Sequence, residues 1–259
     1  MDKKLDIKWY NSIDSTNMQA ERELSSANEG TVWIADYQTS GRGQRGNVWE
    51  SAKGANLMFT ILLRPVFLPA QEQFLISQIT ALAIVNYLKD KGLNAKIKWP
   101  NDIYVGNRKI CGILIAHTVA GANLSASIIG VGLNINQTRF DSDAPNPTSL
   151  ILEKNGLLPG DYTGLESYDR KQELAHVLVK LMELYDLLEE GGVEQIKASY
   201  LENMYRLGGY YKFRNLSGRG EEEIIEAKIL GPDSYGCLIL EKRDGTQEHF
   251  AFQEIRYIL

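Results

Sequence analysis

Two long stretches of the chain repeat apolar residues at helical spacing. The first begins at Pro69 and ends before Gly92, and the second covers 168–190. Proline suits the first turn of a helix and glycine the position after its end. A wide apolar stripe indicates a helix packed against a sheet or another helix. Shorter helices are predicted from an N-cap at Asp14 or Ser15 to about Ser26, and over 149–154 and 193–205.

Short runs of β-branched and aromatic residues lie between these helices and favour strands. The turn Gly106-Asn107-Arg108 separates two of the runs and predicts a hairpin. The predicted strands cover 5–13, 31–37, 55–63, 95–99, 103–105, 109–116 and 124–135. This mixture predicts an α+β fold in which a mixed sheet carries helices on one side.

The pattern changes at Gly208-Gly209. From Tyr210 onward the chain holds strand-like segments separated by glycine-containing turns, and no helical repeat. Five short strands within about 50 residues predict a small β-barrel. We therefore expect two domains, one over 1–208 and a smaller one over 209–259.

Composition limits the possible functions. The chain has 259 residues, of which 44% are hydrophobic, which is enough for a sizeable core. Its net charge of −5 argues against nucleic acid as a partner. Cys111 and Cys237 form no CxxC pair, so neither a zinc site nor a disulfide framework is expected. Without a signal-peptide pattern or a long apolar run, we expect a cytoplasmic protein with no membrane association.

One stretch combines glycine with arginine: Gly41-Arg42-Gly43-Gln44-Arg45-Gly46-Asn47-Val48-Trp49. Glycines let the backbone approach a ligand closely, and successive backbone N–H groups can bind an anion. The arginine guanidinium matches carboxylate and phosphate oxygens. Alone, such a run is more often a solvated surface turn.

The case for a binding site at the glycine–arginine run is strengthened by a second stretch, Lys98-Trp99-Pro100-Asn101-Asp102, and by Lys109 beyond it. Joining a carboxylate to a nucleotide phosphate requires cations, because two anions must approach each other. Mg²⁺ commonly bridges nucleotide phosphates. The candidate groups near predicted strand ends are Arg42, Arg45, Lys98, Lys109, Asn101, Asp102, Asn134, Trp49 and Trp99. The three histidines form no Ser/His/Asp or Cys/His arrangement, and we expect packing or surface roles for them.

At these residues the sequence resembles biotin protein ligases. The resemblance covers essentially the whole chain and depends on the glycine–arginine run occurring together with 98–102. The shared motifs are Asp14-Ser15-Thr16-Asn17, Gln38, the run 41–49, the stretch 98–102, Lys109–Leu114 and Gly130–Asn136. The resemblance implies a catalytic domain related to class II synthetases, with helices packed on a mixed sheet, and a C-terminal SH3-like barrel.

The resemblance also implies an activity. Such enzymes use ATP with Mg²⁺ to convert biotin into biotinoyl-5′-AMP and release pyrophosphate. They then transfer biotin to one lysine of a biotin carboxyl carrier domain, such as that of acetyl-CoA carboxylase, and release AMP. The resemblance leaves open whether the chain is a monomer or a homodimer.

Site residues follow from the resemblance position by position. Biotin would contact Ser15, Thr16, Gln38, Gly41, Arg42, Lys109 and Gly112. ATP and the adenylate would contact Gly43, Gln44, Arg45, Gly46, Trp49, Lys98, Asn101 and Asn134. The catalytic groups would be Lys109, Arg42 and Asp102, and Asn101 and Asp102 would support the nucleotide and metal. Separately from the resemblance, the acceptor lysine must be neutral when it attacks, and we assign its proton to Asp102 as a nearby carboxylate. No direct protein ligand is assigned to Mg²⁺, which ATP would carry. Two of these segments also have a structural interpretation: Asp14 or Ser15 as a helix N-cap, and Trp99-Pro100 as core and strand end.

The sequence departs from the family pattern in two places. Gln44 replaces the second arginine of the usual glycine–arginine loop, which in the family helps to retain the adenylate. We hypothesise that the neighbouring Arg45 substitutes for it. The chain also begins close to the catalytic domain, so we expect a ligase without the helix-turn-helix of repressor-type relatives and without operator binding.

Two alternative functions remain open at this point. A lipoate or octanoate ligase of the same superfamily would share the fold and differ in its acid substrate. A regulator that binds biotin without turnover would fit a loop weakened by Gln44.

Overall fold

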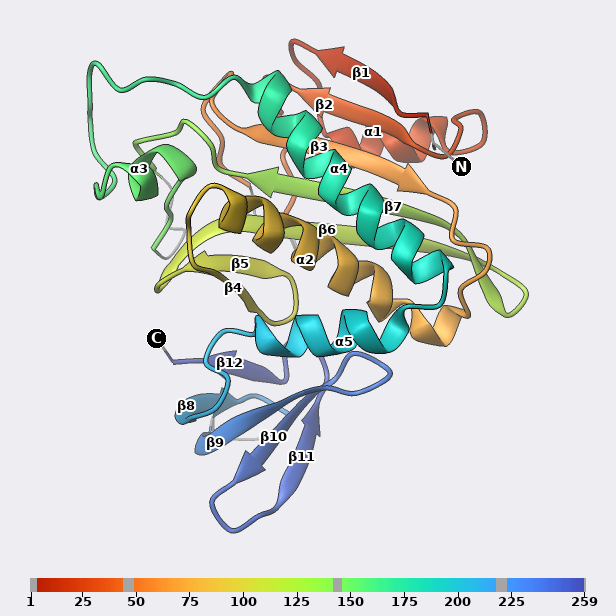
Figure 1. Ribbon diagram of the computed structural model, residues 1–259, viewed down its shortest axis with the longest axis vertical. Coiled ribbons are helices and arrows are strands. Elements are labelled where there is room, and N and C mark those ends of the chain that lie inside the picture. Colours follow the sequence, from red (N-terminus) through yellow and green to blue (C-terminus); the bar gives the residue numbers. More distant parts are fainter. Residues whose placement is uncertain (1–3, 44–48, 142–145, 218–222, 259) are drawn as a thin grey trace.

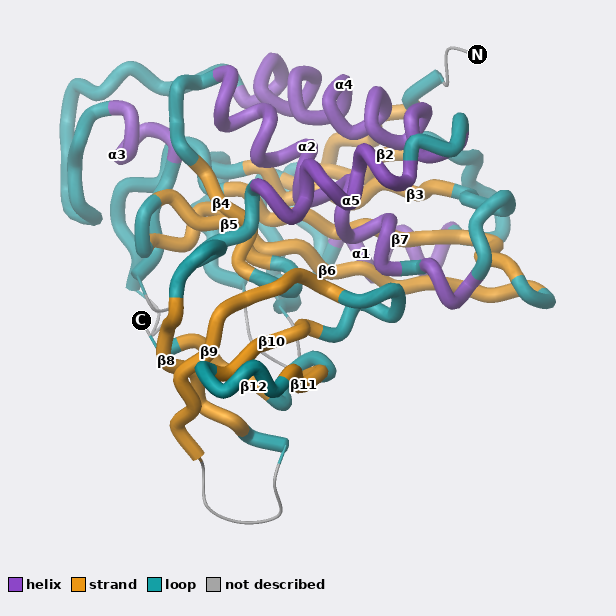
Figure 2. The backbone as a smooth tube through the Cα atoms, turned by 60° about the horizontal axis from the view of Figure 1, so that its bottom comes forward, coloured by secondary structure: helices purple, strands orange, loops and turns teal. Residues whose placement is uncertain are grey.

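The computed structural model describes residues 4–43, 49–141, 146–217 and 223–258. Its strands form two sheets, one of seven and one of five strands. Figures 1 and 2 both show the second sheet lying beyond β4, β5 and helix α5. In the described part of the chain, no helix has the length and apolar content needed to cross a membrane.

The first sheet has the strand order β1-β2-β3-β7-β6-β5-β4. It is mixed, because β1 pairs in parallel with β2 while the other neighbours are antiparallel. Its strands are β1 (Asp6–Tyr10), β2 (Thr31–Ala35), β3 (Leu57–Leu63), β4 (Ala95–Lys98), β5 (Asp102–Val105), β6 (Arg108–Ala120) and β7 (Asn123–Leu133). All seven predicted strands are present. The hairpin strand β6 runs past the predicted end at 116, because β7 continues to pair with it to Ala120.

Helices cover both faces of this sheet, so the prediction of helices on one side is wrong. The long helix α2 (Phe74–Asp90) packs on one face, with α4 (Arg170–Glu189) and α5 (Val193–Glu202) beside it. The short helix α1 (Thr16–Glu23) lies on the opposite face, behind the sheet in Figure 1. Strand alternation explains this, because Val32 and Ile34 face the main core while Trp33 packs with Ala20 of α1.

Proline, glycine and serine residues mark the ends of two of the helices. Pro69 precedes a turn of 3₁₀ helix over Ala70–Glu72, and α2 begins after it, later than the sequence predicted. Gly92 ends this region with φ +78°, a conformation that glycine adopts readily. Helix α3 (Leu150–Lys154) begins at Ser149, whose hydroxyl accepts a hydrogen bond from Leu152 N.

The second sheet is antiparallel, with the order β11-β10-β9-β8-β12. Its strands are β8 (Tyr210–Asn215), β9 (Glu223–Pro232), β10 (Leu238–Lys242), β11 (Gln247–Phe250) and β12 (Ile255–Tyr257). Phe213 and Tyr257 from this sheet belong to the same buried cluster as Tyr200 and Tyr205. The predicted boundary near residue 208 precedes β8, and the division into domains 1–208 and 209–259 stays a prediction.

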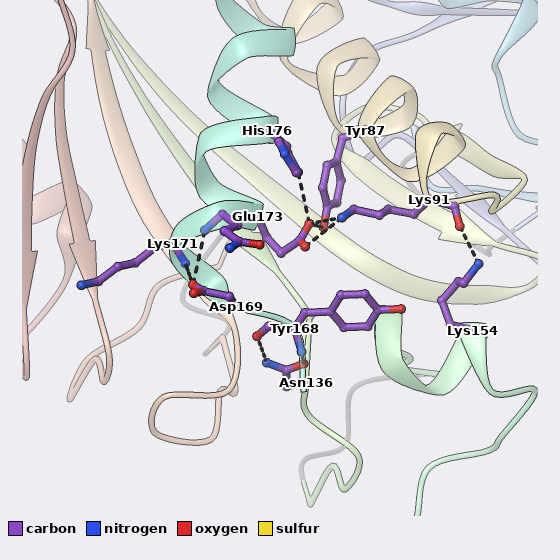
Figure 3. A network of polar contacts seen from close by, with 10 residues as sticks. Tyr87, Lys91, Asn136, Lys154, Tyr168, Asp169, Lys171, Glu173 and His176 are labelled. Carbon is purple, nitrogen blue, oxygen red and sulfur yellow. Dashed lines mark hydrogen bonds and ion pairs between the residues drawn. The ribbon is translucent and has the colours of Figure 1, made fainter. Parts of the chain in front are cut away.

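A buried polar network connects the helical layer to the end of β7 (Figure 3). Glu173 of α4 accepts a hydrogen bond from the Tyr87 hydroxyl (2.7 Å) and forms an ion pair with Lys91 (2.6 Å). Burial and the Glu173 carboxylate raise the pKa of Tyr87 well above its usual range. Nearby, the Asn136 side chain bonds the backbone N–H and C=O of Tyr168. These contacts fix the chain just beyond Asn134, a predicted site residue.

Candidate active site

Most of the described predicted site residues line one cavity of about 880 Å³. This volume falls within the range of about 300–1,000 Å³ that is typical of ligand sites. The cavity lies between the first sheet and the second. From the prediction it contains Ser15, Thr16, Gln38, Arg42, Gly43, Trp49, Lys98, Asn101, Asp102, Lys109, Gly112 and Asn134. Gly41 is not among the residues that line the cavity, and Gln44, Arg45 and Gly46 fall outside the described residues.

Gly41 and Trp49 join the two ends of the glycine–arginine run. Trp49 N donates to Gly41 O (3.1 Å), and a Cβ atom at Gly41 would lie 2.9 Å from Trp49 O. Glycine is therefore needed at position 41 for the close approach of two backbone segments. Arg42, whose side chain is exposed, and Gly43 both line the cavity.

Glycines of β6 and β7 form a flat floor beneath Trp49. Gly112 and Gly132 lie directly opposite each other in the sheet. A Cβ atom at Gly112 would lie 2.9 Å from Trp49 Cζ3, and one at Gly132 would overlap the indole more severely. The indole Nε1 is buried without a hydrogen-bond partner among the described residues. Gly132 belongs to one of the shared family motifs but had no predicted role, although glycine inside a strand often marks a close approach.

The start of α1 forms another wall. The Gln38 side-chain oxygen accepts hydrogen bonds from Thr16 N (2.7 Å) and from the Thr16 hydroxyl (3.2 Å). Ser15 occupies the N-cap position, but its side chain makes no capping hydrogen bond. Asp14 accepts from Ser15 N, and the Arg22 guanidinium holds the pKa of Asp14 well below its usual range. The expected side-chain cap is therefore wrong, and Ser15 lines the cavity instead.

Asn17 lines the cavity as well and was not among the predicted site residues. Its side-chain oxygen accepts from the Thr60 hydroxyl (2.5 Å), and its amide donates to Leu114 O (3.3 Å). Gly130 leaves the space for this amide, because a Cβ atom there would overlap it. Asn17 thus fixes α1 against the glycine-bearing strand, and its position beside Thr16 in a shared motif was the available signal.

Lys98 lies mostly buried between two aromatic rings. Its ammonium is 4.7 Å from the centre of the Tyr104 ring and 5.3 Å from that of Tyr257. It also donates to the Tyr104 hydroxyl (3.1 Å). Burial lowers the pKa of Lys98. Its neighbour Trp99 is buried and donates to Gly236 O (2.9 Å), so Trp99 connects the two sheets.

Lys109 and Asp102 form an ion pair of 2.6 Å on adjacent strands β6 and β5. The Lys109 ammonium also lies 5.6 Å from the centre of the Trp49 ring. Asn101 donates to Ile113 O (2.6 Å), which holds the turn before β5. The hairpin therefore brings together the cation and the carboxylate that the sequence assigned to chemistry.

Asn134 stands at the end of β7. Its amide donates to Thr148 O (2.9 Å), while its side-chain oxygen is buried and has no partner among the described residues. Together with Trp49 Nε1, this oxygen is an unsatisfied polar atom of a residue lining the cavity. Buried polar atoms normally have hydrogen-bond partners. A bound molecule with an acceptor and a donor would supply partners for Trp49 Nε1 and the Asn134 oxygen.

The second sheet also supplies part of the wall, which sequence analysis did not predict. Its lining residues are Leu216, Phe252, Gln253, Ile255, Arg256 and Tyr257. Of the described residues around the cavity, four are cations (Arg42, Lys98, Lys109 and Arg256) and two are carboxylates (Glu50 and Asp102). The cavity is thus positively charged in a chain whose net charge is −5, and it favours an anionic ligand.

Comparison with known proteins identifies the family. Residues 9–134 match the Biotin/lipoate A/B protein ligase family. Over 243 residues the chain is 34% identical to the biotin–[acetyl-CoA-carboxylase] ligase of Paracoccus denitrificans, covering 90% of this chain and 93% of that protein. The chain belongs to the biotin protein ligase family. It is also 29% identical over 245 residues to the bifunctional ligase/repressor BirA of Bacillus subtilis, covering 93% of this chain and 71% of that protein.

A solved structure has the same fold. Biotin protein ligase from Aquifex aeolicus, in complex with biotin and ATP, superposes with a TM-score of 0.77 at 24% identity. The match covers 98% of this chain and 99% of that one. It confirms the predicted fold class, in which a mixed sheet with helices is followed by a second sheet consistent with an SH3-like domain.

Proposed function

We propose that this biotin protein ligase uses ATP to activate biotin and then transfers it to a lysine of a carboxyl carrier domain. The observation that carries the proposal is the match along nearly the full length of a biotin–[acetyl-CoA-carboxylase] ligase. The cavity supports it, because the two motifs that define the family converge there around the Lys109–Asp102 pair.

In the first step a biotin carboxylate oxygen attacks the α-phosphorus of ATP. A new O–P bond forms, the bond to the β-phosphate oxygen breaks, and pyrophosphate leaves. Arg42 and Lys109 neutralise the two anions as they meet, which is electrostatic stabilisation of the transition state. Mg²⁺ carried by ATP supplies further neutralisation of the phosphates. No protein side chain is assigned as a direct ligand of this ion, which the nucleotide would hold.

The biotin ring would lie beside Ser15, Thr16 and Gln38. Its ureido group needs both donors and acceptors, which hydroxyl and amide side chains provide. Thr16 and Gln38 are already fixed to each other by hydrogen bonds, so their orientation is set before biotin arrives. Gly112 would let the apolar part of biotin approach the strand, and Gly41 and Arg42 would lie over it.

The nucleotide would occupy the part of the cavity around Trp49, Asn134 and Lys98. The Trp49 ring would pack against adenine, and the unpaired oxygen of Asn134 would accept a hydrogen bond from the ligand. Asn101 would support this wall, and Gly43 would approach the phosphates. Gln44, Arg45 and Gly46 would complete this set, and they lie outside the described residues.

In the second step the neutral amine of the acceptor lysine attacks the carbonyl carbon of biotinoyl-5′-AMP. An amide bond forms and the bond to the phosphate oxygen breaks, so AMP leaves. The amine loses a proton, and we assign its acceptance to Asp102. In the structure this carboxylate pairs with Lys109, so it also positions the cation that stabilises the leaving phosphate.

The acceptor would be a biotin carboxyl carrier domain, and the reaction would take place in the cytoplasm. Both cysteines are free thiols, with Cys111 buried and Cys237 half-buried. Unpaired thiols are usual in a reducing compartment.

A transfer assay tests this function. The protein is incubated with biotin, MgATP and a purified carboxyl carrier domain, and mass spectrometry measures biotin on the acceptor. We expect one biotin per domain, and none on a variant whose acceptor lysine is replaced by arginine. Biotin on neither domain, with the acceptor shown competent by another ligase, would contradict the proposal.

A further inference from the structure

Two buried amide side chains lie behind the cavity. Asn56, directly before β3, is fully buried, and Gln137, beyond the end of β7, is 3% exposed. The Asn56 amide nitrogen donates to the Gln137 side-chain oxygen (2.7 Å), although the two residues are far apart in the sequence. Neither belongs to the residues that line the cavity, and the proposed reaction assigns no role to either of them.

Both amides bond the segment that follows Trp49. The Gln137 oxygen also accepts a hydrogen bond from Ala52 N (2.9 Å), and the Asn56 amide nitrogen also donates to the Ser51 hydroxyl (3.1 Å). A buried donor that loses its acceptor costs free energy, so these bonds hold the backbone of the segment in place. The pair therefore fixes the chain directly after the indole that lies on the glycine floor.

The same pair fixes a second segment of the site. The Asn56 side-chain oxygen accepts a hydrogen bond from Ile135 N (2.9 Å). Ile135 follows Asn134, whose own side-chain oxygen is buried without a partner among the described residues, as is Trp49 Nε1. One pair of amides thus holds the segments that carry both of these unsatisfied groups.

Trp49 and Asn134 are the residues that the proposed function places against the nucleotide. A ring that packs on adenine and an oxygen that accepts its hydrogen bond must keep a fixed separation, because a displacement of about 1 Å can cost about a hundredfold in rate. We propose that Asn56 and Gln137 are positioning residues of the nucleotide site, which set the separation of Trp49 and Asn134. This inference rests on the proposed function.

Replacement of Gln137 by alanine tests the inference. Gln137→Ala removes the acceptor of Ala52 N and of the Asn56 amide. In biotin-dependent ATP–pyrophosphate exchange we expect the KM for ATP to rise about tenfold, because buried donors lose their acceptor. The KM for biotin should stay near the wild-type value, since Thr16 and Gln38 are held by a separate set of hydrogen bonds.

Gln137→Glu tests which atoms act, and it is close enough in shape to serve if the alanine variant does not fold. Gln137 Nε2 donates to Arg139 O (2.9 Å) and lies 3.5 Å from a Glu50 carboxylate oxygen. An ionised carboxylate at this position would face only acceptors, whereas the neutral acid keeps one acceptor and one donor. Relative to wild type, the KM for ATP should be raised at about pH 8 and recover at about pH 6, because burial raises the pKa of a carboxyl group.

Asn203→Ala is the control for the loss of a side-chain amide. Asn203 donates to Ser199 O at the end of α5 and is not among the cavity-lining residues, so both KM values should stay near wild type. The inference would be overturned by an unchanged KM for ATP in Gln137→Ala, by an equal rise for ATP and biotin, or by no recovery of Gln137→Glu at the lower pH. A wild-type protein without biotin-dependent exchange would instead refute the proposed function.

Discussion

Gly132 shows how a single residue shapes the site. The Trp49 indole lies on the space that a Cβ atom of residue 132 would fill. A side chain there must push the indole toward the cavity or away from the strand. The glycines of β6 and β7 are therefore a requirement of the site rather than of the sheet, where glycine is unfavourable.

We predict that Gly132→Ala lowers biotin adenylation by at least about tenfold, because overpacking typically costs about 1–3 kcal/mol. Exchange kinetics measure the activity, and tryptophan fluorescence reports the displaced indole. Gly160→Ala is the control, since its Cβ atom would make an ordinary contact, 3.4 Å from the Tyr162 ring. Wild-type exchange by Gly132→Ala would contradict the described position of Trp49.

Asp102 allows the two half-reactions to be separated. Asp102→Asn keeps the shape of the side chain but removes the carboxylate that would accept the proton of the acceptor lysine. We expect transfer from supplied biotinoyl-5′-AMP to fall by about a hundredfold, the typical contribution of a general base. ATP–pyrophosphate exchange should fall less, because only the position of Lys109 is affected. An equal loss in both assays would show that Asp102 positions Lys109 and is not the base.

Most of the described residues that the sequence and its family resemblance marked for the site do line one cavity, while their roles stay predictions. Lys109 and Asp102 meet because they lie on paired strands of a hairpin that the turn at 106–108 indicates. Arg256 could not be predicted in this way. Its place in the cavity depends on how the second sheet packs against the first, and no local pattern encodes that contact. The Ser15 cap failed because the N-cap position does not determine where the hydroxyl points.

At the scale of elements, the helical layer depends on a buried acidic group. Glu173 of α4 holds both the Tyr87 hydroxyl and the Lys91 ammonium of the α2 region (Figure 3). We predict that Glu173→Ala lowers the free energy of unfolding by about 3 kcal/mol, because it leaves a partly buried cation and a buried hydroxyl without their acceptor. Urea denaturation measures the change.

Glu194→Ala provides the control for this prediction. Glu194 also pairs with a lysine on a helix, but its side chain is 87% exposed. An exposed pair of this kind contributes at most about 0.5 kcal/mol. Similar changes in the two variants would show that the Glu173 network adds no specific stability.

The apolar pattern of the sequence predicts the individual helices and strands, but it predicts only part of their arrangement in space. Among the described residues, the helices and the strands of the first sheet lie near their predicted ranges, because long apolar repeats and turn residues are local signals. The side of the sheet that α1 covers was predicted wrongly. It depends on the Trp33 face of β2 being buried as well as the Val32 face, and a strand buried on both faces has no alternation to read.

For the whole molecule, the cavity is a product of two sheets. Trp99 belongs to a family motif, yet its indole donates to Gly236 of the second sheet and its ring lies edge-on to Phe252. The motif thus aligns the wall that carries Arg256 with the wall that carries Lys109. Both sheets therefore contribute side chains to the one cavity in which we propose that biotin and ATP bind.

Biotin-dependent ATP–pyrophosphate exchange tests the central claim most directly, with lipoate and octanoate as competing acids. The account predicts exchange with biotin and none with the other two acids, and loss of exchange in Lys109→Ala. Exchange with lipoate or octanoate in place of biotin would move the function to the sister ligases. No exchange with any acid, from a protein that still binds biotin, would contradict the assignment of an adenylating site.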